Sequence, residues 1–271
     1  QAIEENWIKP YYQPVVWADD RTLCGVEALA RWIDPIKGML PPYQFIPTLE
    51  NNHLIHKLDT CIMENVCKDI RKSLDRNLPV VPVSINFSRL DFELCDIFKI
   101  VEDIRVKYNV PRNMLDMEIT ESALNENFGH IKDECRKMHD LGYNIWLDDF
   151  GSGYSSLNTL VEYSFDVLKL DMVFLRSFDR NPKTSTLMTY IIDGAKAMGI
   201  QPLCEGVESE EHYEFLKRSG CDKLQGYYFA KPMPGEKFEE HILGGEHPVE
   251  KASERNYHRT IGAINYLSSD P

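Results

Sequence analysis

The sequence offers no cysteine pair of the kind that builds a disulfide framework or a zinc site. The cysteines are odd in number and scattered, and they form no C-x-x-C pair; they are Cys24, Cys61, Cys67, Cys95, Cys135, Cys204 and Cys221. Isolated cysteines of this kind are typical of reduced thiols in the cytoplasm. We therefore expect a chain that folds without disulfides.

Long apolar runs and an excess of positive charge are also missing. No run approaches the roughly 20 apolar residues that span a bilayer, and the first residues do not resemble a signal peptide. We expect a cytoplasmic domain, although the full-length protein could still be anchored to a membrane. The 43 acidic and 30 basic residues leave a net charge of −13, which argues against binding to DNA or RNA polymers. An anionic small substrate remains compatible, because bound divalent cations can reverse the local charge.

Strand-like and helical segments alternate along the chain. At 271 residues and 43% hydrophobic content, the chain has a size at which an α/β barrel commonly forms a single domain. The strand-like segments are residues 11–17, 22–32, 80–88, 115–122, 143–150, 165–171, 200–207 and 222–230. The clearest helical segments are residues 54–74, 130–142, 184–199 and 208–220. This order predicts an α/β fold, a TIM-like (β/α)₈ barrel.

Both ends of the chain modify this prediction. The first two strand-like segments are joined only by ADDRT, residues 18–22. That connection is too short for a helical crossover, so we expect one antiparallel strand near the N-terminus. We expect the barrel to occupy residues 1–245 and the polar residues 246–271 to form a C-terminal tail with at most a short helix. The early start of the first strand is what we expect of a domain excised from a larger multidomain protein.

The segment WLDDFGSGYSSL, residues 146–157, places two carboxylates side by side at the end of an apolar stretch. Asp148 and Asp149 each raise the free energy of ionising the other, and burial adds to this effect. A buried pair therefore needs a compensating cation. A solvated turn is the alternative, because Asp and Gly are common turn residues.

Other polar residues fall at or near the ends of further strand-like segments. They are Glu27, Asn86, Glu118, Lys169, Asp171, Glu205, Glu208 and Gln225. Taken singly, each could be a surface charge, a turn or cap residue, or a hydrogen-bonding partner of a neighbouring strand. In a barrel, however, the carboxyl ends of the strands meet at one mouth. Carboxylate and amide oxygens that converge there suit Mg²⁺ or Mn²⁺ better than zinc.

Eight motifs in a fixed order connect this pattern with a known family. EALARW, residues 27–32, resembles the signature of EAL-domain phosphodiesterases, which hydrolyse the bacterial second messenger cyclic di-GMP. The resemblance covers about residues 8–240 and includes YYQPVV, SINFS, MEITES, LDDFGSGYSSL, VLKLD, CEGVES and QGYYFAKPM. Ser152 stands where the family often has Thr, and Cys204 stands where it often has Ala. Neither departure removes a ligand.

The resemblance implies a cyclic-guanylate-specific phosphodiesterase that opens one phosphodiester bond of cyclic di-GMP to give linear pGpG, lowering the messenger level in bacterial signalling. It also implies two Mg²⁺ or Mn²⁺ ions as cofactors, with Ca²⁺ expected to inhibit. The implied metal ligands are Glu27, Asn86, Glu118, Asp148, Asp149 and Glu205. The implied catalytic residues are Lys169, Gln225, Glu27 and Glu205.

Further roles are implied around this centre. Gln13, Arg31 and Asp171 resemble substrate-binding positions, and the planar donors of Arg31 suit a phosphate. Glu121 is expected to anchor the loop 149–157. Glu208 is expected to support the metal-binding residues without binding the metal itself. Glycines 151 and 153 would let this loop bend, so that a partner or neighbouring subunit could control metal occupancy.

The expected partner is cyclic di-GMP, in a homodimer, with sensory or GGDEF-type domains compatible with the full-length protein. One alternative is a non-catalytic cyclic di-GMP receptor, but such relatives usually lack the Asp-Asp pair or the glutamate of the EAL motif, and both are present. A second alternative is an unrelated Mg²⁺ barrel enzyme, such as a lyase of the enolase type. The ordered motifs argue against it.

Overall fold

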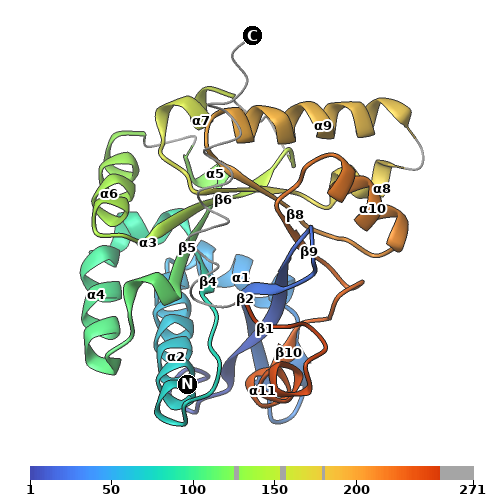
Figure 1. The fold of residues 1–271 in the computed structure, drawn as a ribbon. Coiled ribbons are helices and arrows are strands. Elements are labelled where there is room, and N and C mark those ends of the chain that lie inside the picture. Colours follow the sequence, from blue (N-terminus) through green and yellow to red (C-terminus); the bar gives the residue numbers. More distant parts are fainter. Residues whose placement is uncertain (125–127, 153–156, 179–180, 251–271) are drawn as a thin grey trace.

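The computed structural model describes residues 1–124, 128–152, 157–178 and 181–250, and its centre is a closed β-barrel (Figure 1). The barrel strands are β1 (Ile8–Trp17), β2 (Leu23–Asp34), β4 (Val83–Phe87), β5 (Leu115–Thr120), β6 (Asn144–Phe150), β7 (Val167–Leu170), β8 (Gln201–Cys204) and β9 (Lys223–Gln225). They lie in the order β1-β9-β8-β7-β6-β5-β4-β2, and pairing of β1 with β2 closes the ring. The predicted TIM-like barrel is confirmed.

Among the described barrel strands, β1 alone runs antiparallel to both neighbours. It pairs with β2 through Gln13 and Glu27, and with β9 through Val15 and Gln225. The remaining barrel neighbours pair in parallel. The antiparallel strand predicted from the short ADDRT connection is therefore confirmed. Two short strands, β3 (Gly38–Leu40) and β10 (Met233–Pro234), extend the sheet beside β2 and β1.

Helices lie against the outer face of the barrel (Figure 1). The longest is α2 (Ile55–Asp75), which corresponds to the helical segment predicted at residues 54–74 and buries Leu58, Ile62 and Val66 on one face. The other predicted helices appear as α6 (Phe128–Asp140), α9 (Pro182–Ala197) and α10 (Glu210–Arg218). The remaining helices are α1 (Pro42–Asn51), α3 (Arg89–Leu94), α4 (Ile97–Tyr108), the 3₁₀ helix η1 (Arg112–Met114), α5 (Glu121–Leu124), α7 (Leu157–Glu162), α8 (Val173–Phe178) and α11 (Gly235–Gly244). In the part of the chain that is described, no helix combines the length and apolarity needed to cross a membrane.

The last barrel strand is shorter than its sequence suggests. Residues 222–230 read as one strand, but β9 ends at Gln225. A Cβ atom placed on Gly226 would lie only 2.1 Å from the carbonyl oxygen of Val207. This close backbone approach is open only to glycine. The chain then turns away from the barrel, and the amide of Phe229 donates to the Gly226 carbonyl over 3.1 Å.

The two ends of the barrel interior differ in chemistry. The end remote from the mouth is filled by a separate apolar cluster of Val15, Trp17, Cys24, Trp146, Val167 and Leu203. The chain beyond α11 also reaches this end, where the amide of Leu23 donates to the Pro248 carbonyl and the indole of Trp17 to Glu250. The domain boundary at residue 245 stays a prediction, and residues 251–271 of the predicted tail lie outside the described residues.

Candidate active site

The centre of the mouth is the completely buried side chain of Lys169 on β7. Its Nζ lies 2.5 Å from Glu118, 2.7 Å from Glu205, 3.1 Å from Asp148 and 3.4 Å from Glu27, measured to a carboxylate oxygen in each case. Burial opposes a charge here, but these carboxylates outweigh it and raise the pKa of Lys169 well above its ordinary value. Lys169 is therefore an ammonium ion at any physiological pH.

One ammonium does not neutralise the carboxylates around it. Burial, followed by the charge of Glu27, raises the pKa of Glu118 well above its ordinary value. Burial raises the pKa of Glu205 to about 8 and also raises that of Asp148, against the opposing effect of Lys169. In the protein alone these groups relieve the surplus of negative charge by binding protons. A bound cation would relieve it in the same way.

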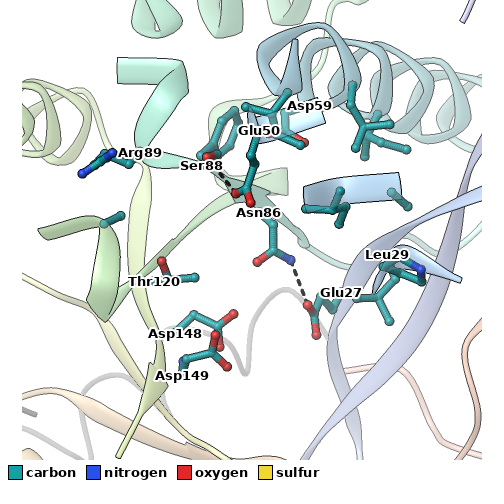
Figure 2. A pocket seen from close by; sticks show the side chains of 18 of the residues that line it. Glu27, Leu29, Glu50, Asp59, Asn86, Ser88, Arg89, Thr120, Asp148 and Asp149 are labelled. Carbon is teal, nitrogen blue, oxygen red and sulfur yellow. Dashed lines mark hydrogen bonds between the residues drawn. The ribbon is translucent and has the colours of Figure 1, made fainter. Parts of the chain in front are cut away.

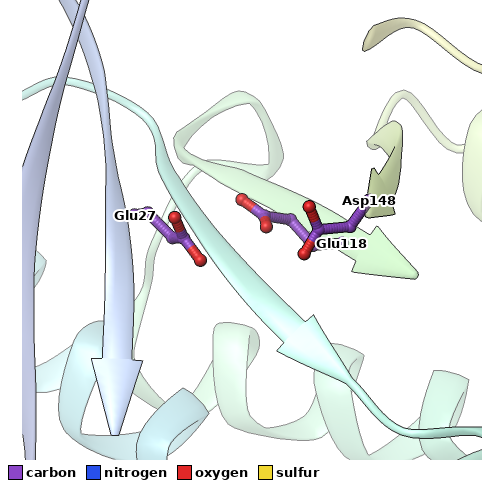
Figure 3. Close-up of side chains that lie close together, drawn as sticks. All are labelled: Glu27, Glu118 and Asp148. Carbon is purple, nitrogen blue, oxygen red and sulfur yellow. The ribbon is translucent and has the colours of Figure 1, made fainter. Parts of the chain in front are cut away.

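Three of the carboxylates form a ligand set of the size a metal ion needs. Glu27 on β2, Glu118 on β5 and Asp148 on β6 each place one oxygen within 4.8 Å of the others, and Figure 3 shows the three side chains turned toward a common space. Among the described residues, Oε1 of Glu118 is buried without a hydrogen-bond partner. A buried, unpartnered carboxylate oxygen is costly unless a cation or donor meets it. The donor set therefore fits a hard divalent ion such as Mg²⁺ or Mn²⁺.

A β-bulge resolves how two adjacent aspartates can face the same cavity. The β6–β7 pairing runs from Leu147 opposite Leu168 to Phe150 opposite Leu170, so two residues of β6 face Lys169 alone. Without the bulge, Asp148 and Asp149 would point to opposite faces of the sheet. Both instead line the cavity and lie next to each other in Figure 2.

The second aspartate of the bulge has an unusual backbone. Asp149 has a φ of 58°, in the left-handed region, which costs a non-glycine residue on the order of 1–2 kcal/mol. Burial, and next the charge of Asp148, raises the pKa of Asp149 to about 6. Both features are typical of residues that are held in place for a function.

Amide side chains fix Glu27 from both sides. Asn86 donates to Oε1 of Glu27 over 2.9 Å, and Gln225 donates to Oε2 over 2.7 Å. Gln225 also donates to Gln13 over 3.2 Å, and Gln13 donates to the Ala230 carbonyl over 3.3 Å. Burial alone would raise the pKa of Glu27, but Lys169 and the two amides lower it. Glu27 is therefore the carboxylate of the cluster most firmly held in its ionised form.

The cluster lies at the floor of a cavity of about 1050 Å³. The predicted site residues among its lining are Gln13, Glu27, Asn86, Asp148, Asp149, Glu205 and Gln225. Lys169 and Glu118 lie directly below them, in contact with Asp148 and Glu27 through the ammonium group. Eight of the residues predicted from the strand-end pattern therefore lie together, and Gln13, which was predicted from the family resemblance, lies with them.

The other four predicted residues are Asp171, Arg31, Glu121 and Glu208. Asp171 accepts from the amide of Val173 over 2.6 Å and shares a hydrogen bond with Asp149. The guanidinium of Arg31 donates to the Ala30 carbonyl and lies 5.7 Å from the ring centroid of Tyr11.

Glu121 is buried at the start of α5, whereas Glu208 is exposed on the chain before α10. The loop that Glu121 is predicted to anchor includes residues 153–156, which lie outside the described residues, as does the predicted hinge at position 153. The roles assigned to these four residues stay predictions.

The sequence analysis missed a second acidic group at the far end of the cavity. Glu50 and Asp59 line that end together with Ser88 (Figure 2), and the completely buried Asp91 lies behind Asp59. Burial raises the pKa of Asp91 to about 6 and that of Asp59 well above its ordinary value. The signal was present, because Asp59 precedes Ile62 by three residues and so falls on the buried face of α2.

Comparison with known proteins agrees with this geometry. A family model described as "EAL domain" matches residues 1–232. The chain belongs to the EAL-domain family. The EAL domain described here is 34% identical over 240 residues to the cyclic di-GMP phosphodiesterase PdeR of Escherichia coli, covering 88% of this chain and 36% of PdeR. It is 31% identical over 245 residues to the cyclic di-GMP phosphodiesterase RocR of Pseudomonas aeruginosa, covering 90% of this chain and 62% of RocR.

A solved structure shows the same fold. The PaMucR phosphodiesterase in complex with cyclic di-GMP superimposes on this EAL domain with a TM-score of 0.83 at 31% identity, covering 88% of this chain and 96% of the other. The chain spans about a third of the length of several curated relatives. Those relatives are signalling proteins with further segments outside the EAL domain.

Proposed function

We propose that this EAL domain hydrolyses one phosphodiester bond of cyclic di-GMP to linear pGpG, with Mg²⁺ or Mn²⁺ as cofactor. The observation that carries the proposal is the buried surplus of carboxylates around Lys169, at the floor of a cavity large enough for a dinucleotide. The names of PdeR and RocR, and the ligand of the PaMucR structure, support the choice of substrate. In the cell, the reaction would lower the messenger level.

The chain's own residues suggest how the cofactor would be held. Glu27, Asn86, Glu118 and Asp148 would hold one ion, and Asp148, Asp149 and Glu205 a second. The bulge brings Asp148 and Asp149 to the same side of β6, so both carboxylates would be available to the ions. When bound, such ions lower the pKa of water and withdraw charge from the phosphoryl oxygens. Ca²⁺ would serve poorly, because it prefers a larger and looser shell of oxygen ligands.

Lys169 would stabilise the charge that develops during attack on phosphorus. Its ammonium is fixed in advance by four carboxylates, so no reorganisation is needed at the moment of reaction. Gln225 presents a second polar group, since its amide nitrogen donates to Glu27 while its buried Oε1 lacks a partner among the described residues. That oxygen could accept a hydrogen bond from the attacking water.

Substrate would be oriented by groups at the edge of the cavity. Gln13, next to Gln225, would contact the dinucleotide, and Arg31 would turn from the Ala30 carbonyl to a phosphate oxygen. Asp171, which shares a hydrogen bond with Asp149, would also contact the substrate. Water would then add to phosphorus with loss of a proton and one P–O ester bond would break. The released alkoxide oxygen would take up a proton to become a hydroxyl.

Incubating the purified domain with cyclic di-GMP and Mn²⁺, followed by chromatography of the products, tests the proposal. We expect linear pGpG to accumulate with Mn²⁺ and not in excess chelator. Binding of cyclic di-GMP without any product would instead show a non-catalytic receptor. We further propose a cytoplasmic homodimer in a multidomain protein, which light scattering of the purified chain can test for oligomeric state.

A further inference from the structure

The short segment that follows β7 touches the loops that carry two of the proposed metal ligands. On one side lies Gly151, two residues after Asp149. A Cβ atom placed on Gly151 would lie 2.2 Å and 2.3 Å from two ring carbons of Phe174, and the φ of Gly151 is 95°. The loop after β6 therefore rests directly on the Phe174 ring, with no room for any side chain between them.

The loop after β8 approaches the same segment from the other side. Gly206 follows Glu205 directly and has a φ of 70°. A Cβ atom on Gly206 would lie 2.4 Å from Cβ of Met172 and 3.2 Å from its Cα. A change of side-chain rotamer at Met172 would not relieve this contact, because Cβ and Cα do not move with the rotamer.

Backbone hydrogen bonds tie both loops to the strand end. The amide of Asp171 donates to the Phe150 carbonyl over 3.2 Å, and the amide of Glu205 donates to the Leu170 carbonyl over 3.1 Å. The left-handed backbone of Asp149 is one that surrounding contacts must hold. The contact of Phe174 with Gly151 adds to the local hydrogen bonds at Asp149, whose amide donates to Asp148 over 2.8 Å and whose carbonyl accepts from Ser152 over 3.1 Å.

We propose that Met172 and Phe174 are positioning residues that fix Asp149 and Glu205 in the geometry needed for metal binding. Phe174 acts through Gly151 on the bulged aspartate, and Met172 acts through Gly206 on Glu205. Neither residue supplies a ligand. The metal-binding role of the two carboxylates rests on the proposed function, so the test measures Mn²⁺ affinity separately from turnover.

The first test replaces Phe174 by Ala and uses Phe178→Ala as the matched control. Phe178 lies on the same helix, α8, but packs on Phe215 of α10 with ring centroids 4.6 Å apart. Both variants lose one aromatic ring and should lose similar thermal stability. We expect the Mn²⁺ dissociation constant, measured by calorimetry without substrate, to rise about 10-fold for Phe174→Ala and to stay at the wild-type value for Phe178→Ala. Equal Mn²⁺ affinities in both variants would overturn the proposal.

The second test uses the contact at Met172 and stays informative if Phe174→Ala does not fold. Gly206→Ala introduces the Cβ clash, and Met172→Gly removes the atom that it meets. We expect Gly206→Ala to weaken Mn²⁺ binding about 10-fold or more, and Gly206→Ala with Met172→Gly to recover part of that loss. Recovery will be incomplete, because alanine is still strained at a φ of 70°.

Absence of any recovery in Mn²⁺ affinity would show that Met172 does not act through Gly206, and would overturn its assignment. Turnover of cyclic di-GMP is measured in parallel. A wild-type protein that binds Mn²⁺ but cleaves no cyclic di-GMP would contradict the proposed function and leave this positioning role open to the same affinity test.

Discussion

Replacing Lys169 by Met separates catalysis from metal binding at the barrel mouth. The ammonium lies within 3.4 Å of four carboxylates, and Met keeps most of the apolar stem while removing the charge and its donors. Loss of an electrostatic stabiliser typically lowers kcat about 10²–10³-fold. We expect a fall of that size, with the KM for cyclic di-GMP changed far less.

The Mn²⁺ affinity of Lys169→Met should stay the same or rise, whereas a structural defect at the site would lower it. Lys169 repels a divalent ion that approaches Glu27, Glu118 and Asp148, so Lys169→Met should bind Mn²⁺ as tightly as the wild type or more tightly. Stability without metal should fall, because removing one partner of a buried ion pair costs about 3–5 kcal/mol when the other stays charged. The loss should be smaller at pH 5 than at pH 8, since the carboxylates bind protons at the lower pH.

The assay pairs chromatographic turnover with calorimetry of Mn²⁺ binding. Lys196→Met is the matched control, because Lys196 forms a half-buried ion pair with Asp222 at 2.6 Å, away from the cavity lining. The control should keep the wild-type kcat. The reasoning would be refuted if Lys169→Met retained kcat within about threefold, or if it lost Mn²⁺ affinity together with kcat.

Three other perturbations test the remaining parts of the site. Glu27→Ala should abolish hydrolysis while the protein stays folded by circular dichroism, because a metal ligand at the barrel mouth contributes to the site rather than to the apolar core; wild-type turnover would contradict its role. Hydrolysis should require Mg²⁺ or Mn²⁺ and proceed poorly with Ca²⁺, and full activity in excess chelator would rule this out. The third change is Asp59→Asn. Burial raises the pKa of Asp91 to about 6 and that of Asp59 well above its ordinary value. The protonated pair therefore contributes fully to the stability of the folded protein below about pH 4. This contribution is lost as the pH rises through the pKa values of the folded protein. The variant should therefore melt higher than the wild type at pH 8 but not at pH 5, and an identical difference at both pH values would show that the pair does not titrate.

The barrel could be predicted because its signals are local. Each strand and helix carries its own apolar pattern, and the length of the ADDRT connection alone determines that β1 runs antiparallel to β2. The convergence of polar residues at the mouth followed from a general property of barrels. Glu27, Glu118 and Asp148, from three different strands, were predicted to meet on this ground and do lie together.

What could not be predicted depends on contacts between distant segments. The end of β9 at Gln225 is set by the approach of Gly226 to Val207, on another strand end. The Asp59–Asp91 pair joins residues of two helices that lie 32 positions apart in the sequence, since 91 − 59 = 32. A pattern of apolar residues shows which face of a helix is buried, but not which buried face it meets.

The bulge in β6 depends both on a local sequence feature, the Asp148-Asp149 pair, and on pairing with a neighbouring strand, β7. In a regular strand the side chains alternate between the two faces, so only one of Asp148 and Asp149 would face the mouth. The extra residue opposite Lys169 removes that restriction, but it requires a left-handed backbone at Asp149. Burial, and next the charge of Asp148, also raises the pKa of Asp149 to about 6. Neither the left-handed backbone nor the raised pKa of Asp149 stabilises the fold. The single ammonium of Lys169 cannot balance the carboxylates that surround it. Such a bulge is understandable if the functional state contains additional positive charge, and this donor set fits a divalent ion.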